Sequence, residues 1–272
     1  MRKTSSKYGF IMAGWGQIRR IVSQADIILE VLDARDPLST MSRKLEKIVN
    51  ELGRDLILVL NKADLVPRSI VEEWVRLFRD RGYHAVYMAA SKHMGTRVLR
   101  KKIKEVAASL PVVVAVVGFP KTGKSSIINA LKGKHSASTS PIPGSPGYTK
   151  HAQLYRIDSN ILMIDTPGVI PVEGSMLERI IRGMNPDQLE DPVNPAIELI
   201  KKIMRHNPTA FIQAYGISEE DPLKILEHIA IKRGWFYKKT HEPLIEEAAR
   251  TVIRDFHRGK IPYYVPPYSA SI

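Results

Sequence analysis

Five short apolar segments recur along the first 170 residues, and a helical pattern lies between most of them. The segments are 27–32 (IILEVL), 55–60 (DLILVL), 84–89 (HAVYMA), 112–117 (VVVAVV) and 161–165 (ILMID). Such runs are typical of strands that are buried on both faces of a sheet. The helical patterns cover 11–24, 38–52, 69–81, 95–109 and 124–132. This alternation predicts a doubly wound, mostly parallel α/β sheet over residues 1–172.

Two departures from this alternation lie later in the chain. The stretch "QLYRIDSNILMID" has turn residues at Asp158–Asn160, so we expect a hairpin and one antiparallel edge strand. Residues 173–194 are rich in Pro, Asp and Asn, which predicts a linker. Helical patterns at 195–206, 219–233 and 242–258 then predict a small all-α domain over 195–272. Its tail, with three prolines in six residues, is expected to be extended rather than helical.

A phosphate-binding loop follows the fourth apolar segment. Residues Gly118–Ser125, "GFPKTGKS", match G-x-x-x-x-G-K-[ST] between a predicted strand and a predicted helix. In this loop backbone N–H groups surround a β-phosphate, and the two glycines allow its oxygens to approach closely. We expect Lys124 to neutralise phosphate charge and Ser125 to bind Mg²⁺. The predicted nucleotide contacts of the loop and helix start are Gly118, Lys121, Thr122, Gly123, Lys124, Ser125 and Ser126.

Two other strand ends carry residues suited to a guanine base. In "NKAD", Asn61–Asp64, the Asp64 carboxylate can accept hydrogen bonds from N1–H and the 2-amino group, which adenine lacks. The Lys62 stem can lie along the purine face, and Asn61 can tie the loop to its neighbours. The backbone of Ala89, Ala90 and Ser91, after the next strand, is expected near the guanine O6. The three loops together predict a GTP site.

A third motif, "DTPG" at Asp165–Gly168, follows the last apolar segment. Asp165 can hold a Mg²⁺-bound water, and the Gly168 N–H can meet a γ-phosphate. The motif alone is compatible with an ordinary strand-ending turn. Beside a phosphate loop it indicates these contacts to a Mg²⁺-bound water and to a γ-phosphate.

Composition narrows the possible partners. The chain has no cysteine, which excludes disulfides, thiolate metal sites and thiol catalysis. Its net charge is +13, and from Ser175 onward 14 Lys and Arg nearly balance 13 Asp and Glu, so the first 174 residues carry almost all of the excess. This favours a polyanionic partner such as nucleic acid over a merely soluble basic protein. We see no signal peptide or membrane-spanning run, and expect a cytoplasmic protein with no membrane partner.

The motif order is unusual for a guanine-nucleotide switch, because the base-reading loops precede the phosphate loop. All these loops lie at the carboxyl ends of strands, so a permuted chain can still bring them together; "SLP" at Ser109–Pro111 would be the new join. This order, with "EVLDARDP" at 30–37, resembles the circularly permuted Ras-like GTPases of the YlqF/YawG class. The stretches "RRIVSQADIILEVLDARDPLST" and "RDFHRGKIPYYVPP" are most similar to its archaeal and nucleolar, nucleostemin-like branch.

The resemblance implies a function that composition and spacing do not show. It implies a GTP- and GDP-binding, Mg²⁺-dependent GTPase that assembles the large ribosomal subunit, with rRNA and subunit precursors as partners. The segment "SPGYTK" resembles the family's switch I, which would bring Thr149 to Mg²⁺ and to the γ-phosphate. Lys124, Thr149 and Gly168 would then be the catalytic residues. We expect a monomer and no DNA partner.

Three departures from related GTPases leave the catalytic group open. Val169 follows "DTPG" where Ras-like enzymes place a water-orienting Gln, and "GFIMAGW" lacks the His that the bacterial branch has there. Lys121 stands where many related loops carry an Asn that helps to hold K⁺. We therefore predict slow intrinsic hydrolysis, on the order of 10⁻³ s⁻¹ or below, stimulated by a ribosomal partner. A nucleotide-gated RNA-binding module with little hydrolysis, and a metabolic kinase or ATPase, remain alternatives.

Three basic stretches are candidates for RNA contact. The stretches "IKRGWFYKKTH" (231–241) and "RDFHRGKIPYY" (254–264) interleave cations with aromatics, and "TRVLRKKIKEV" (96–106) is a basic helix. Cations neutralise phosphates and aromatic rings stack on unpaired bases. Aromatics such as Trp235, Phe236 and Tyr263 could instead belong to a core, with the lysines as a solvated rim. The basic helix could be an ordinary solvated face.

Overall fold

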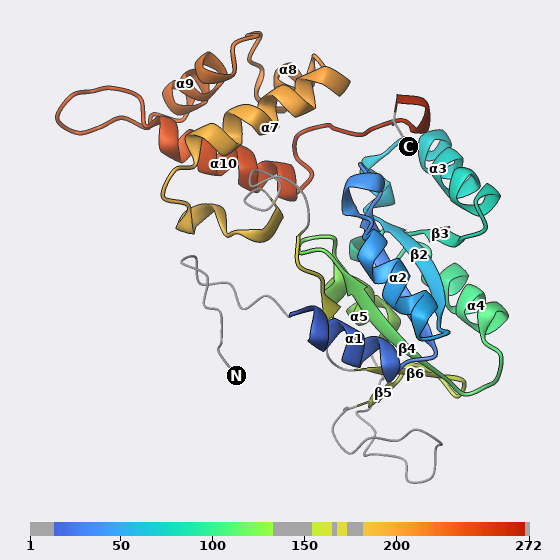
Figure 1. The fold of residues 1–272 in the computed structure, drawn as a ribbon. Helices are drawn as coiled ribbons and strands as arrows, with labels where there is room; N and C mark the ends of the chain where they lie inside the picture. Colours follow the sequence, from blue (N-terminus) through green and yellow to red (C-terminus); the bar gives the residue numbers. More distant parts are fainter. Residues whose placement is uncertain (1–13, 133–153, 165–167, 173–181, 270–272) are drawn as a thin grey trace. The chain divides into compact units, whose positions relative to one another are not determined.

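The computed structural model describes residues 14–132, 154–164, 168–172 and 182–269 (Figure 1). They fall into two compact units. One lies within Met12–Pro171 and takes in the tail from Pro266, and the other lies within Val172–Val265. In the described part of the chain, no helix is both long and apolar enough to span a membrane.

The first unit is built on a mixed sheet. Its strands are β1 (Ile27–Asp33), β2 (Asp55–Asn61), β3 (His84–Tyr87), β4 (Val112–Gly118), β5 (Leu154–Arg156), β6 (Ile161–Ile164) and β7 (Gly168–Val169). The order is β3-β2-β1-β4-β6-β5, and β7 also pairs with β4. Every pairing is parallel except that of β5 with β6, which confirms the predicted hairpin and antiparallel edge. The predicted doubly wound α/β fold is confirmed.

Helices cover both faces of this sheet. They are α1 (Trp15–Ser23), α2 (Arg43–Glu51), α3 (Arg68–Asp80), α4 (Thr96–Val106) and α5 (Lys124–Lys132). The chain moves outward from β1 to β3 and then returns across the sheet to β4, so the helix before β4 changes face. Leu99 and Ile103 of α4 and Ile127 of α5 share one core with alternate residues of β1 and β4. Figure 1 shows α1 and α2 on the opposite face.

Several helices and strands begin or end at other residues than predicted, and for one helix a capping contact is the reason. The helix expected over 38–52 is divided into a 3₁₀ turn at Leu38–Thr40 and α2, because the buried Ser42 is an N-cap whose hydroxyl accepts from the Leu45 N–H at 3.2 Å. Helix α4 ends at Val106 rather than 109, and β3 ends at Tyr87 rather than 89. Beyond these changes, each predicted strand and helix lies within a few residues of its expected place.

The second unit is helical, as predicted. It contains α7 (Val193–His206), α8 (Ala210–Tyr215), α9 (Pro222–Lys232) and α10 (Ile245–His257). Helix α9 begins where Asp221 accepts hydrogen bonds from the Leu223 and Lys224 N–H groups, at 2.8 and 3.0 Å. The short helix α8 was not expected, since six residues are too few for an apolar period to be visible.

Part of the predicted linker is folded into the second unit. A 3₁₀ turn spans Pro186–Gln188, and the buried Leu189 accepts a hydrogen bond from Arg250 through its carbonyl, at 3.0 Å. Arg254 pairs with Asp187 at 2.5 Å. The second half of the predicted linker is thus anchored to α10.

The C-terminal stretch decides one open alternative and corrects one expectation. Tyr263 is only 2% exposed and packs against the rings of Phe256 and His206, so it belongs to the core, which was one of the two alternatives for this aromatic. The tail was expected to lack helix, yet Pro267–Ser269 forms a 3₁₀ turn in contact with α3. Proline fits the first turn of such an element, because the N–H it lacks has no partner there in any case.

Candidate nucleotide-binding site

The phosphate loop joins the end of β4 to the start of α5, and its two glycines are required by its shape. Gly118 has a φ of +153°, and a Cβ there would lie 2.7 Å from the Val31 carbonyl oxygen. Gly123 has a φ of +98°, and a Cβ there would overlap the side-chain amide of Asn61. The loop therefore follows a tight path, and at its two glycines no side chain blocks the approach of a phosphate group. It opens at the N-terminus of α5, where helix N–H groups favour an anion.

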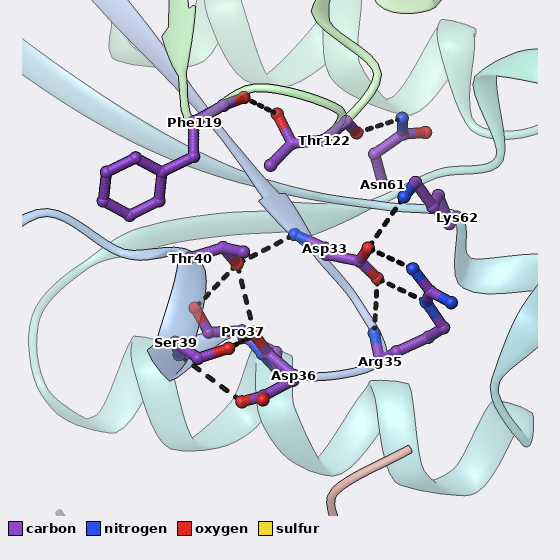
Figure 2. A network of polar contacts seen from close by, with 10 residues as sticks. All are labelled: Asp33, Arg35, Asp36, Pro37, Ser39, Thr40, Asn61, Lys62, Phe119 and Thr122. Atoms are coloured by element: carbon purple, nitrogen blue, oxygen red, sulfur yellow. Dashed lines mark hydrogen bonds and ion pairs between the residues drawn. The ribbon is translucent and has the colours of Figure 1, made fainter. Parts of the chain in front are cut away.

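Asn61 connects the three predicted nucleotide loops. Figure 2 shows its Nδ2 donating to the Thr122 carbonyl in the phosphate loop, at 2.9 Å. Its Oδ1 accepts from the Ala90 N–H at 3.1 Å. Asn61 itself is the last residue of β2 and is buried. One side chain thus ties "NKAD", the loop of Ala89–Ser91 and the phosphate loop together, although they are up to 61 residues apart in sequence.

The cation of the phosphate loop is held inside it. Lys124 is buried, and its Nζ donates to the Phe119 carbonyl at 2.6 Å, which also accepts from the Thr122 hydroxyl at 2.9 Å. Burial lowers the pKa of the Lys124 ammonium to about 8. A phosphate beside it would favour the charged form and raise that pKa again. Ser125 and Ser126 are exposed in the first turn of α5, where a hydroxyl can reach a phosphate-bound cation. These residues fit a Mg²⁺–phosphate group.

The base-reading side has its polar groups in place. Lys62 adopts a left-handed backbone with a φ of +63°, and the Asp64 side chain is 14% exposed with one oxygen 3.2 Å from Lys92 Nζ. Asp64 is thus oriented by an exposed lysine that a guanine could displace at little cost. The second loop is closed by paired backbone bonds between Ala89 and Met94, at 3.0 and 3.1 Å. Ala90 is buried and Ser91 exposed.

Gly168 lies beside the phosphate loop. Strand β7 pairs Val117 with Gly168 and Gly118 with Val169, which brings the end of "DTPG" to the loop's first residue. A Cβ on Gly168 would lie 2.5 Å from Val117 Cγ1, so packing alone already requires glycine here. Thr149 and Asp165 lie outside the described residues.

A buried ionic network next to this site was not predicted. Asp33, the last residue of β1, bonds both Arg35 and Lys62 (Figure 2). In the sequence, "EVLDARDP" at 30–37 supports only a family resemblance. A signal was present, since an acid ending an apolar strand and an arginine two residues later form a natural pair, but nothing in the sequence connects them to Lys62.

Comparison with known proteins identifies the family. The model of the RsgA GTPase family matches residues 13–174, more than half of the chain. The chain belongs to the RsgA GTPase family. The crystal structure of GNP-bound YlqF from T. maritima is similar over 92% of this chain and 96% of that one, with 25% identity and a TM-score of 0.67. The resemblance to circularly permuted GTPases of the YlqF class is thereby confirmed, and with it the permuted order of the motifs.

Curated relatives are longer than this chain. A GTP-binding protein of Methanocaldococcus jannaschii is 37% identical over 91% of the chain and 65% of its own length. Nucleolar GTP-binding protein 2 of Neurospora crassa is 33% identical over 93% of the chain and 41% of its length. The Drosophila melanogaster guanine nucleotide-binding protein-like 3 homolog is 31% identical over 92% of the chain and 48% of its own length. The chain thus spans between two fifths and two thirds of these relatives.

Proposed function

We propose that this protein is a GTP-binding and GTP-hydrolysing assembly factor for the large ribosomal subunit, which binds rRNA or subunit precursors according to its nucleotide state. The observation that carries the nucleotide part is the pair of Asn61 hydrogen bonds, which fixes a base-reading loop to a phosphate loop. The ribosomal part is supported by the basic charge and by relatives named for the nucleolus.

Each residue of the site has a distinct task in this proposal. Asp64 accepts from the guanine edge, Lys62 lies along the purine, and the loop from Gly118 to Lys124 surrounds the phosphates. Ser125 would hold Mg²⁺ together with Thr149 and Asp165, and the ion would neutralise charge on the β- and γ-phosphates. Gly168, which pairs with Val117 beside the loop, would offer its N–H to the γ-phosphate when GTP is bound.

Intrinsic hydrolysis is proposed to be slow, on the order of 10⁻³ s⁻¹ or below. Val169 replaces the water-orienting Gln and is held in β7 against Gly118. An aliphatic side chain cannot orient water, so hydrolysis would need another group of this chain or a group from a partner. The same observation favours a second candidate, an RNA-binding module gated by nucleotide with little hydrolysis of its own.

Two surfaces are proposed to contact RNA phosphates. On the first unit a hollow along α4 is lined by Arg97, Arg100, Lys101, Lys104, Glu105 and Asp158. On the second unit a loop between α9 and α10 exposes Phe236 and Tyr237 next to Lys238 and Lys239. Exposed cations with adjacent exposed rings suit single-stranded RNA.

Exchange of base specificity tests the nucleotide proposal. Asp64→Asn replaces two acceptor oxygens with one acceptor and one donor, so it should bind xanthosine nucleotides and lose GTP. Affinities for GTP, XTP and ATP would be measured by displacement of a fluorescent GDP from the wild type and of a fluorescent XDP from the variant. Equal binding of ATP and GTP by the wild type would contradict the proposal and favour a kinase or ATPase.

Sedimentation of ribosomal particles tests the ribosomal part. With a non-hydrolysable GTP analogue the protein should travel with the large subunit or its precursors, and with GDP it should stay at the top of the gradient. If hydrolysis drives release, a hydrolysis-deficient variant that keeps GTP binding should accumulate on precursors. Release that is equally fast without hydrolysis would favour the RNA-binding module.

A further inference from the structure

The end of β1 lies at the centre of the nucleotide edge of the sheet. Strand β1 pairs with β2 on one side and with β4 on the other, so Asp33 lies between the base-reading loop and the phosphate loop. Its register partner is Asn61. The turn that follows is held by its own groups, because the Asp33 N–H donates to the Thr40 hydroxyl at 3.0 Å and that hydroxyl donates to the Pro37 carbonyl at 3.0 Å. The backbone at Asp33 is therefore held by the protein itself.

This carboxylate binds two cations. Its Oδ1 accepts from Arg35 Nε at 2.9 Å, and its Oδ2 accepts from Arg35 Nη2 at 2.7 Å and from Lys62 Nζ at 2.8 Å (Figure 2). The exposed fractions of the Asp33 and Arg35 side chains are 7% and 3%, and that of Lys62 is 17%. Burial alone would raise the pKa of Asp33, but Arg35 and Lys62 hold it well below its usual value, so the acid stays charged. The forked arginine restricts the carboxylate in orientation as well as in position.

Lys62 is the residue that this arrangement restrains. It follows Asn61, which is bonded to both neighbouring loops, and it precedes Asp64 by two residues. Its left-handed φ of +63° is uncommon for a lysine and persists only where surrounding contacts enforce it. Backbone hydrogen bonds hold this turn, from the Leu65 N–H to the Lys62 carbonyl at 3.0 Å and from the Ala63 N–H to the Met88 carbonyl at 3.1 Å. The ion pair with Asp33 restrains the other end of the lysine side chain.

We propose that Asp33 is a positioning residue for nucleotide binding: held by Arg35, it fixes the Lys62 ammonium so that the lysine stem forms a preorganised surface for the purine ring. The inference rests on the proposed role of Lys62 and Asp64 in holding the base. The stem has no group that distinguishes one purine from another, so Asp33 governs affinity for purine nucleotides, while Asp64 governs which purine is chosen.

A double-mutant cycle read by nucleotide affinity tests this role. Asp33→Asn keeps the shape but removes the charge, and should weaken GDP and IDP by the same factor of about ten, within the range seen for coupled neighbours. Lys62→Met should weaken both to a similar degree, and it leaves the Asp33–Arg35 pair intact, so it should fold. In the Lys62→Met background, Asp33→Asn should have no further effect on affinity.

Ser42→Ala is the matched control for a merely structural effect. It removes the cap of α2, the helix that follows β1, and should lower the melting temperature without changing GDP affinity more than twofold. An Asp33→Asn effect that persists fully in Lys62→Met, or no loss of affinity in either single variant, would overturn the inference. If Asp33→Asn does not fold, Lys62→Met decides alone: unchanged GDP and IDP binding overturns it.

Different results would contradict the proposed function and the positioning role of Asp33. A wild-type protein that binds no guanine nucleotide, or an Asp64→Asn variant with unchanged base preference, would remove the proposed base site itself. Unchanged affinity in the Asp33 and Lys62 variants of a protein that does bind GDP would remove only the positioning role.

Discussion

Single residues determine how closely the base-reading loop and the phosphate loop pack together. Gly123 and Asn61 come from different loops, and the space that a Cβ would need at Gly123 is filled by the Asn61 amide. That amide is also the donor to Thr122. The requirement for glycine in this phosphate loop therefore comes from the neighbouring base loop as well as from the phosphates.

Gly123→Ala should accordingly disrupt both loops. The added methyl group meets Asn61 in a backbone conformation that alanine rarely adopts, so we expect a loss of at least about 2 kcal/mol in the free energy of unfolding. GDP binding should fall below detection in a fluorescence titration. Gly16→Ala is the control, because Gly16 is helical with open space around it, and it should be neutral or slightly stabilising. Normal GDP binding by Gly123→Ala would refute this reading of the contact.

Lys121 has a backbone conformation that is unfavourable for lysine. Its φ of +63° is left-handed, a conformation that asparagine adopts more readily than lysine. Lys121→Asn should therefore raise the free energy of unfolding, by up to about 1 kcal/mol, in urea titrations of the free protein. If the Lys121 ammonium takes the place of K⁺, wild-type hydrolysis should be equal in K⁺ and Na⁺, and the variant should become K⁺-dependent. A wild type that already requires K⁺ would exclude that role.

At the scale of elements, the strands were the most predictable part of the fold. Segments such as 112–117 are buried on both faces of the sheet. A short run in which every residue is apolar is stable in a small domain mainly as a central strand, where both faces are shielded from water. Helix ends were harder, because they depend on single capping contacts. The 38–52 helix is interrupted by one serine side chain, and α8 is too short to show a period.

Strand β1 contains a carboxyl group whose charged form is opposed by its surroundings. Glu30 lies in the middle of β1 with no exposed surface, and burial raises its pKa to about 8, against the effect of a hydrogen bond from the Ser42 N–H and with a further rise from Glu46. The Glu46 carboxylate accepts a hydrogen bond from the Tyr83 hydroxyl at 2.6 Å, so it is held near by. Glu30 is therefore protonated in the folded protein at neutral pH.

This raised pKa predicts a pH dependence of stability. Between roughly pH 4.5 and 8 the unfolded chain has lost the Glu30 proton and the folded chain keeps it, so stability falls as pH rises, by up to about 1.4 kcal/mol per pH unit from this group. The contribution is complete below the unfolded pKa and is lost as pH passes about 8. Glu30→Gln should flatten the slope in urea titrations at pH 5.5, 6.5 and 7.5. Parallel slopes for wild type and variant would show that Glu30 is ionised in the fold.

For the whole molecule, the permuted order of motifs shows which parts of a site can be predicted from sequence. Parallel strands bring their carboxyl ends to one edge, so the meeting of Asn61, Gly123 and Ala90 followed from topology alone. The bond from Asp33 to Lys62 did not, because it depends on which of many lysines reaches a buried acid across two strands. The proposed roles of Thr149 and Asp165 stay predictions.

Charge is distributed unevenly over the molecule, and this predicts how it should bind RNA. The excess of +13 lies almost wholly in the first 174 residues, where the α4 surface gathers several of the cations. Each phosphate contact with single-stranded RNA contributes about 0.7 to the slope of log K against log salt concentration. Replacing Arg97, Lys101 and Lys104 by Gln should therefore reduce the slope by about 2.

The salt titration needs a control of equal charge. A triple variant of the exposed cations Arg19, Arg68 and Lys201 removes the same net charge from elements other than α4. Binding of a fluorescent single-stranded rRNA fragment would be followed by anisotropy between 50 and 200 mM salt, roughly the range over which such contacts act. The α4 variant should show the shallower slope and keep its GDP affinity, since none of its three residues lies in the nucleotide loops. Equal slopes for the two variants would mean that overall charge, rather than the α4 surface, attracts RNA.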